Sequence, residues 1–368
     1  FLTLYLTKKL DFSVALAARM MSIYGVGALA GAYLGGWLSD RIGYSRVQML
    51  SLFFTGIAYI TVILWENIFP VAVNLFILAV LAEAFRPATS TAFAKNAPKK
   101  IRSRAFAVQR LAINLGVAIG PALGGFIARY NYNYLFWIDG ITCIIAGIMH
   151  YFFIHGKLKK IYDQKAKHKK SVPAFIKDRI FLILLLFSFL LGTFFMQIIS
   201  TWPVYLKEVL TFAENRIGLL LAINTILIVL FEIPLIHSLE KYKKNRIMAI
   251  GALLLCVGFG ILPLGVSYFY VIITVVIWTF GEILIFPTLA ASVSNQASDE
   301  NLGKYMGMYS FAFSLAFAVA PAIGGFVYGH YSPRILWFGI GFCGIMVSAG
   351  FLLTEKILNE NVLDIASE

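Results

Sequence analysis

The sequence is poor in charge and in cysteine, and each shortage excludes a class of protein. Only 13% of the 368 residues are charged and 60% are hydrophobic, so a water-soluble domain could not cover its surface with polar groups. The three cysteines form no CxxC motif, and the five histidines lack metal-ligand spacing. No phosphate-binding GxxxxGK[ST] loop and no Ser/His/Asp or Cys/His constellation occurs at a water-facing helix end. We therefore expect a membrane protein without metal or cofactor that is not an enzyme.

Long apolar segments fill most of the chain. Each can cross a hydrocarbon core of about 30 Å as a helix, and none alternates as the strands of a membrane β-barrel do. The sequence therefore predicts an all-α integral membrane protein. We expect eleven transmembrane helices, at residues 16–38, 47–65, 70–94, 105–127, 134–154, 180–204, 216–238, 247–265, 269–294, 305–328 and 335–353.

Lysine and arginine, which give the chain its net charge of +13, gather in the loops on one side of these helices. The positive-inside rule places those loops in the cytoplasm. The segment GGWLSDRIGYSR at 35–46 lies on that side, and so do a basic linker at 155–179 and a tail at 355–368. We interpret the linker as a solvated loop that sets topology; a specific lipid or partner site is the alternative.

The chain contains an internal repeat at an offset of 200 residues. Asp40 aligns with Glu240, Arg46 aligns with Arg246, and the match continues without a gap, so residues 1–154 and 201–354 are two copies of one unit. The helix expected at 180–204 has no counterpart before Phe1. We therefore expect that this fragment lacks most of a first helix and that the intact protein has twelve helices. The expected domains are an N-terminal bundle at 1–154, the linker, a six-helix C-terminal bundle at 180–354 and the tail.

The loop at 35–46 combines small residues with charges. Its small residues allow a close approach of neighbouring helices, and a cytoplasmic Asp beside two arginines can hold a charge network on that side. The loop is interpreted as a conformational latch; a topological anchor is the alternative. Its motif residues are Gly36, Asp40, Arg41, Gly43 and Arg46.

A second motif, GVAIGPALGG, lies in the helix expected at 105–127. Its GxxxG spacing gives a flat face for close packing, and its proline removes a backbone hydrogen bond and bends the helix. The second repeat carries the degenerate copy AFAVAPAIGG, with Ala316 and Ala320 in place of glycines. The motif residues of the first copy are Gly116, Gly120, Pro121, Gly124 and Gly125.

With these motifs the sequence resembles the major facilitator superfamily over essentially its whole length. The second motif is similar to the antiporter motif of drug:proton exporters within that superfamily. The resemblance implies two pseudo-symmetric six-helix bundles, with helices 4 and 10 lining a central cavity. It also implies that Asp40 faces the start of helix 11, near 302–304, and stabilises the outward-facing state.

A few charges fall inside the expected helices, where each costs around 2.5–3.5 kcal/mol. Glu83 and Arg86 are spaced i, i+3, so they are either a compensating pair or functional residues. Glu282 has no basic residue in its local sequence, so it is our first candidate for proton coupling. We expect Arg110 either to contact an anionic group or to pair with an acidic neighbour on another helix. The remaining candidates are Asn114, near Arg110, and Asp139, near the outer end of its helix.

The sequence therefore predicts a secondary active transporter that exports a small amphipathic compound or drug in exchange for protons, by alternating access. A proton-coupled importer, a uniporter of a metabolite and a transport-inactive receptor are the alternatives. The expected partners are the solute, protons and the lipid bilayer, with no nucleic acid, and the expected state is a monomer. The expected location is a bacterial inner membrane, with the basic loops and both termini of the intact protein in the cytoplasm.

Overall fold

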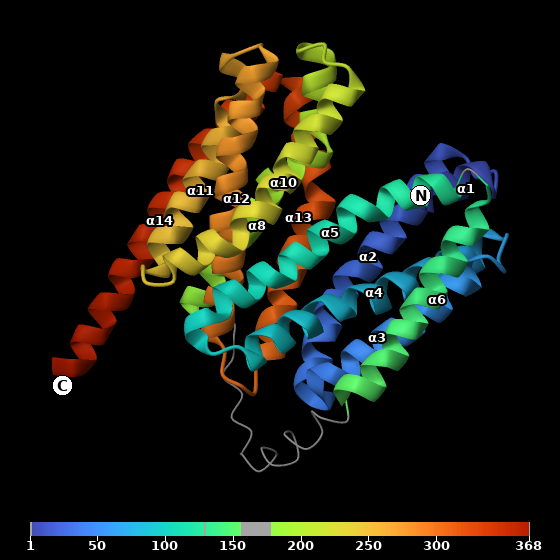
Figure 1. The fold of residues 1–368 in the computed structure, drawn as a ribbon, viewed down its shortest axis with the longest axis horizontal. Helices are drawn as coiled ribbons and strands as arrows, with labels where there is room; N and C mark the ends of the chain where they lie inside the picture. Colours follow the sequence, from blue (N-terminus) through green and yellow to red (C-terminus); the bar gives the residue numbers. More distant parts are fainter. Residues whose placement is uncertain (1, 129, 156–177, 368) are drawn as a thin grey trace. The chain divides into compact units, whose positions relative to one another are not determined.

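The computed structural model describes residues 2–128, 130–155 and 178–367, and long helices dominate these ranges (Figure 1). Each of the eleven expected spans corresponds to one long helix in the described ranges. The long helices are α2 (Val14–Leu38), α3 (Tyr44–Val62), α4 (Ile68–Asn96), α5 (Arg102–Ala128), α6 (Tyr132–His150), α8 (Arg179–Phe195), α10 (Glu214–Leu239), α11 (Lys244–Gly260), α12 (Tyr268–Gln296), α13 (Leu302–His330) and α14 (Pro333–Ser367). Among the described residues, nine segments are long and apolar enough to cross a membrane; the first, Leu16–Val62, joins α2 and α3.

Shorter helical turns extend or connect the long helices. The chain begins with α1 (Leu2–Lys8), and α8 is continued by Met196–Ile199, α9 (Thr201–Val204) and a π-helical turn at Tyr205–Val209. The last helix, α14, continues to Ser367, through the segment that the sequence analysis treats as a tail. Most of the expected basic linker, residues 156–177, lies outside the described residues.

The connection between α2 and α3 is a single π-helical turn, Ser39–Gly43. Gly43 has φ 90°, a backbone conformation that L side chains rarely adopt and that glycine adopts at no steric cost. The turn therefore needs a glycine at its last position, which gives this residue of the 35–46 motif a physical role.

Residue contacts divide the chain into two units. Unit 1 comprises residues 1–96, 115–177 and 297–314, and unit 2 comprises residues 97–114, 178–296 and 315–368. The segments 97–114 and 297–314 are 200 residues apart, the same offset as the sequence repeat. The expected bundle boundaries stay a prediction, because the contact units divide α5 and α13 internally.

Unit 1 is built around α4, which packs against α2 and α3, while α6 packs on α3. Gly27, Gly31 and Gly35 recur every fourth residue on α2, and a Cβ at any of them would collide with the backbone of α4. Small residues at this spacing allow two membrane helices to approach closely. A buried apolar cluster that includes Tyr5, Leu75 and Phe136 lies beside this contact and ties α1 and α6 to the unit.

Unit 2 is built around α11 and α12, with α14 packed on α11 and α10 packed on α12. Phe259 stacks on Trp278 at 5.3 Å and on Trp337 at 6.0 Å between ring centroids, so one aromatic stack joins three helices. Gln197, in the turn Met196–Ile199 that follows α8, donates a hydrogen bond of 2.9 Å to the carbonyl of Ala320 on α13. This hydrogen bond joins the end of the α8 segment to α13 one residue before Pro321.

Candidate functional site

Three charged side chains meet inside unit 2, each from a different helix. Arg110 on α5 lies 2.7 Å from Glu282 on α12, measured from Nη2 to Oε1, and forms a hydrogen bond there. Its Nε lies 3.0 Å from Oε1 of Glu232 on α10. Glu232 is 0% exposed and Glu282 is 3% exposed. We call these three residues the carboxylate cluster.

Neutral polar side chains complete the surroundings of Glu282. The amide Nδ2 of Asn224 on α10 donates to Oε2 of Glu282 at 3.0 Å and to the hydroxyl of Thr279 at 3.1 Å. Asn224 and Glu232 are eight residues apart, about two helical turns, and Thr279 and Glu282 are three apart. Each pair therefore lies on one face of its helix, and the two faces meet.

The cluster carries an unbalanced charge when it is fully ionised. Two carboxylates and one guanidinium sum to one negative charge, and both carboxylates are buried. A buried charge without a counter-charge is strongly unfavourable, so groups in this position neutralise by taking up a proton or pair with a cation. One bound proton would neutralise the cluster.

The other copy of the repeat lacks these charges. At the offset of 200 residues, Glu232, Glu282 and Arg110 correspond to Ala32, Ala82 and Ser310, which lie on α2, α4 and α13. The same helical positions are thus occupied by small residues in the other copy. The cluster is therefore specific to the second repeat and to the part of α5 that packs with it.

The structure supplies the basic partner that the local sequence around Glu282 lacks. The partner comes from α5, 172 residues away in the chain, and it also answers the question left open for Arg110. Glu232, which was not among the candidates predicted from the sequence, belongs to the same cluster. Its eight-residue spacing from Asn224 was the available signal. Asn114, one turn beyond Arg110, has a buried amide nitrogen without a hydrogen-bond partner among the described residues.

The charged candidates of unit 1 comprise one ion pair and one acid on another helix. Glu83 and Arg86 on α4 form an ion pair of 3.5 Å, with 18% and 51% of their side chains exposed, which is the compensating arrangement that their spacing allows. Asp139 on α6 has an exposed side chain. The described contacts do not bring Asp139 into an ion pair, so unit 1 has no arrangement comparable to the carboxylate cluster in its described part.

The 35–46 motif contacts the beginning of α13. Asp40 accepts two backbone hydrogen bonds through its carboxylate, from the N–H of Gly303 to Oδ1 at 2.7 Å and from the N–H of Lys304 to Oδ2 at 2.8 Å. The first N–H groups of a helix have no acceptor within the helix and carry its positive dipole end, so a carboxylate is a matched partner. The contact expected near 302–304 is present. We call Asp40, Gly303 and Lys304 the latch.

Glycines bring α2 and α13 close enough for this contact. A Cβ on Gly36 would collide with the carbonyl of Gly303 and with the backbone of Gly307, and a Cβ on Gly303 would collide with Gly36 and Asp40. The two helices therefore touch backbone to backbone beside the latch. The guanidinium of Arg41 lies 3.9 Å above the ring of Trp37, and Arg46 is exposed.

The equivalent position in the second repeat uses a different contact. Glu240, the counterpart of Asp40, pairs with the side chain of Arg104 on α5 at 3.1 Å. Arg104 is the counterpart of Lys304, so the same two helix ends are joined in unit 2, by an ion pair between side chains in place of hydrogen bonds to the backbone.

The second glycine motif lies in the part of α5 that belongs to unit 1. A Cβ at Gly116 or Gly120 would meet nothing within 4 Å among the described residues, and Gly124 is buried. The helix runs through Pro121 without a break. The close packing expected of this motif at Gly116 and Gly120 is therefore not present in the described part, and its role, including that of Gly125, stays a prediction.

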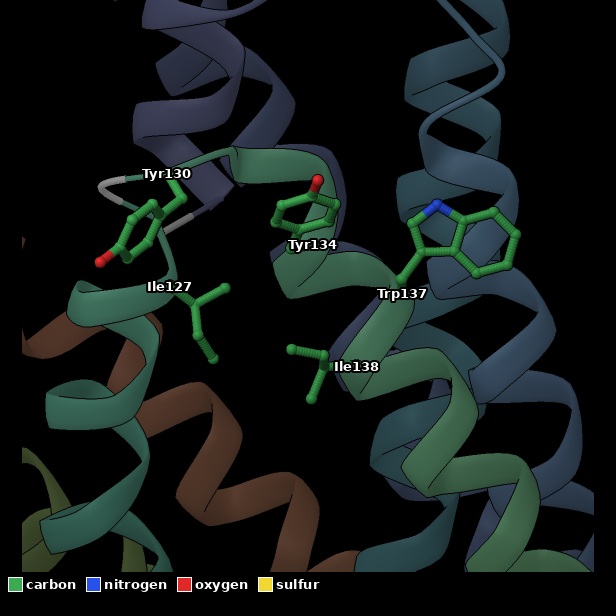
Figure 2. A pocket seen from close by; sticks show the side chains of 5 residues that line it. All are labelled: Ile127, Tyr130, Tyr134, Trp137 and Ile138. Atoms are coloured by element: carbon green, nitrogen blue, oxygen red, sulfur yellow. The ribbon is translucent and has the colours of Figure 1, made fainter.

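An apolar pocket of about 300 Å³ opens between the end of α5 and the start of α6. Figure 2 shows Ile127 and Ile138 facing each other across it, with Tyr130, Tyr134 and Trp137 around them. None of the candidate site residues lines this pocket. Tyrosine and tryptophan at helix ends are typical of the boundary between lipid and water, so we assign the pocket to the membrane-facing surface.

A multi-pass helical protein built from two copies of one unit has the architecture of many secondary transporters. The chain belongs to the Major Facilitator Superfamily, whose family model matches residues 1–213 and 195–365. This confirms the family and the fold class expected from the sequence. Members of the superfamily are transporters, not enzymes.

Individual relatives are distant. A Na⁺, Li⁺, K⁺/H⁺ antiporter of Planococcus maritimus is 24% identical over 387 residues, covering 96% of this chain and 89% of the relative. The quinolone resistance protein NorA of Staphylococcus aureus is 21% identical over 266 residues, covering 72% and 69%. The solved structure of XylE, a proton:xylose symporter, has a TM-score of 0.74 at 14% identity and covers 94% of this chain and 89% of that chain. At that identity the likeness shows the fold alone.

Proposed function

We propose that the protein is a proton-coupled secondary transporter that exports a small amphipathic compound by alternating access. The observation that carries the proposal is the carboxylate cluster, whose two buried acids share one guanidinium. A proton bound there changes the charge inside the membrane by one unit, and such a change can bias a two-state equilibrium.

The latch supplies the second part of the mechanism. Its hydrogen bonds join the end of α2 to the start of α13, and the basic loops suggest that these ends face the cytoplasm. With the latch closed, we expect the cytoplasmic side to be shut. Solute enters from the cytoplasm after the latch opens, and proton uptake by the cluster resets the cycle from the other side.

The names of the relatives support exchange and export. One relative is an antiporter of monovalent cations and protons, and another is a quinolone resistance protein. The proton:xylose symporter shares the fold but moves its solute by symport, so a proton-coupled importer, a uniporter of a metabolite and a transport-inactive receptor are the competing functions. A bacterial inner membrane and a monomeric state belong to the same proposal.

The test is solute-driven proton flux in proteoliposomes that contain the full-length protein. The solutes are lipophilic cations, antibiotics, common metabolites, and Na⁺, Li⁺ and K⁺, and the variants are Glu282→Gln and Glu83→Gln. Glu208→Gln is the matched control, because it also removes one carboxylate but at an exposed position. We expect Glu282→Gln to abolish proton movement while Glu208→Gln retains it. Binding of solute without proton flux in the unmodified protein would refute proton coupling and favour a uniporter or a receptor.

A further inference from the structure

We propose that Glu232 holds the proton of the carboxylate cluster, while Glu282 stays ionised against Arg110. Both acids are almost completely buried, so burial alone does not decide between them. The assignment deepens the proposed function and rests on it in one respect: the proton on Glu232 is taken to be the one that is exchanged for solute.

The hydrogen bonds of the two carboxylates are unequal. Glu282 accepts from Arg110 at 2.7 Å through one oxygen and from Asn224 at 3.0 Å through the other. Among the described residues, neither oxygen of Glu232 accepts a hydrogen bond, although Nε of Arg110 lies 3.0 Å from Oε1. Donors that point at a carboxylate stabilise its ionised form, and charge-assisted bonds are the strong ones. The hydrogen bonds therefore stabilise the ionised form of Glu282, whereas Glu232 lacks this stabilisation.

The charges that reach Glu232 lead to the same assignment. In the described part of unit 2, the charged groups that act on it are Arg110 from α5 and Glu282 from α12. Residues of α10 on either side of Glu232, Ile228 and Ile236, belong to a buried apolar cluster with Ala107 and Ile283. With Glu282 ionised, the positive charge of Arg110 is already matched. A second ionised carboxylate would leave one negative charge in an apolar surrounding, and a proton on Glu232 removes it.

Proton release from this site has a simple balance. The O–H bond of the Glu232 carboxylic acid breaks, the electron pair stays on the oxygen as a carboxylate, and the proton leaves to water. Arg110 then lies between two ionised acids. Glu232 thus acts as the proton-carrying residue, and Asn224 acts as a positioning residue that keeps Glu282 ionised through its hydrogen bond.

The test is infrared spectroscopy of the purified full-length protein in lipid near neutral pH, which detects the C=O stretching band of a protonated carboxyl group. The matched variants are Glu232→Asp and Glu282→Asp, because each keeps a carboxyl group and changes only its length. We expect Glu232→Asp to shift the band and Glu282→Asp to leave its position unchanged. Should Glu232→Asp fold poorly, Glu232→Gln gives the same answer as loss of the band.

A band that shifts with Glu282→Asp, in the presence or absence of an effect of Glu232→Asp, would overturn the assignment. So would a spectrum in which neither substitution moves a protonated carboxyl band. The measurement concerns a bound proton at equilibrium and requires no transport. A Glu232 band in a protein without solute-driven proton flux would therefore refute the proposed coupling and leave Glu232 as the protonated acid.

Discussion

The latch provides a prediction whose size follows from its geometry. Asp40→Asn keeps one oxygen acceptor and replaces the other oxygen by an NH₂ group, which cannot accept from a backbone N–H. One of the two hydrogen bonds, at 2.7 and 2.8 Å, is therefore lost, together with the negative charge at the N-terminus of α13. A hydrogen bond to a charged group contributes about 1.5–3 kcal/mol. Since Asp40 is only half-buried, we expect Asp40→Asn to destabilise the closed latch by about 2 kcal/mol. This raises the ratio of open to closed molecules by about 30-fold.

Hydrogen–deuterium exchange measures this change at the donors themselves. The N–H groups of Gly303 and Lys304 lie in the first turn of α13 and have no acceptor within the helix, so their protection reports the latch. We expect fragments that contain Leu302–Lys304 to exchange up to about 30-fold faster in Asp40→Asn, since exchange follows the open population. Equal exchange in both proteins would refute the role of the carboxylate.

A comparison with the second repeat sharpens the test. Glu240→Gln breaks the ion pair with Arg104, whose side chain is 34% exposed. Partly exposed ion pairs contribute about 0–1 kcal/mol, so we expect exchange at the start of α5 to change by less than at the start of α13. A larger effect of Glu240→Gln than of Asp40→Asn would contradict the importance assigned to backbone donors.

Three further predictions concern packing and the carboxylate cluster. Arg110→Gln leaves two buried acids without a cation, so we expect the free energy of unfolding to fall by about 3–5 kcal/mol. The midpoint of thermal unfolding in detergent should fall with it. An unchanged midpoint would contradict the claim that the buried acids need this cation. Gly36→Val forces a side chain into the backbone of Gly303 and Gly307. Cross-linking between cysteines placed at the end of α2 and the start of α13 should therefore fall. Undiminished cross-linking would argue against the close contact. Asn224→Leu removes a donor to Glu282, and the pH dependence of proton flux should shift; an identical profile would exclude a positioning role.

The sequence predicted much of the fold because membrane helices are encoded locally. A span needs about 20 apolar residues and a topology needs basic loops on one side, and both are properties of consecutive residues. The eleven expected segments became α2–α6, α8 and α10–α14. The repeat was equally visible, since it requires only that two stretches of the same chain be aligned. The contact of Asp40 followed from the resemblance, and its two backbone donors came from the structure.

The carboxylate cluster could not be predicted in the same way. Arg110, Glu232 and Glu282 stand on three helices, and each has only apolar or unrelated neighbours in its own sequence. Local reasoning could pair Glu83 with Arg86, because residues three apart share a helix face, but it left Glu282 without a partner.

The sequence by itself therefore determined the membrane class, the helical segments and the repeat, since the cost of exposing polar groups to lipid acts on each segment separately. Only the tertiary structure decided that Glu232 and Glu282 meet at Arg110, and that the carboxylate of Glu282 receives two hydrogen bonds and that of Glu232 none among the described residues. The reason is that a buried charge is balanced by groups close in space, and packed helices bring together side chains that the chain order keeps far apart.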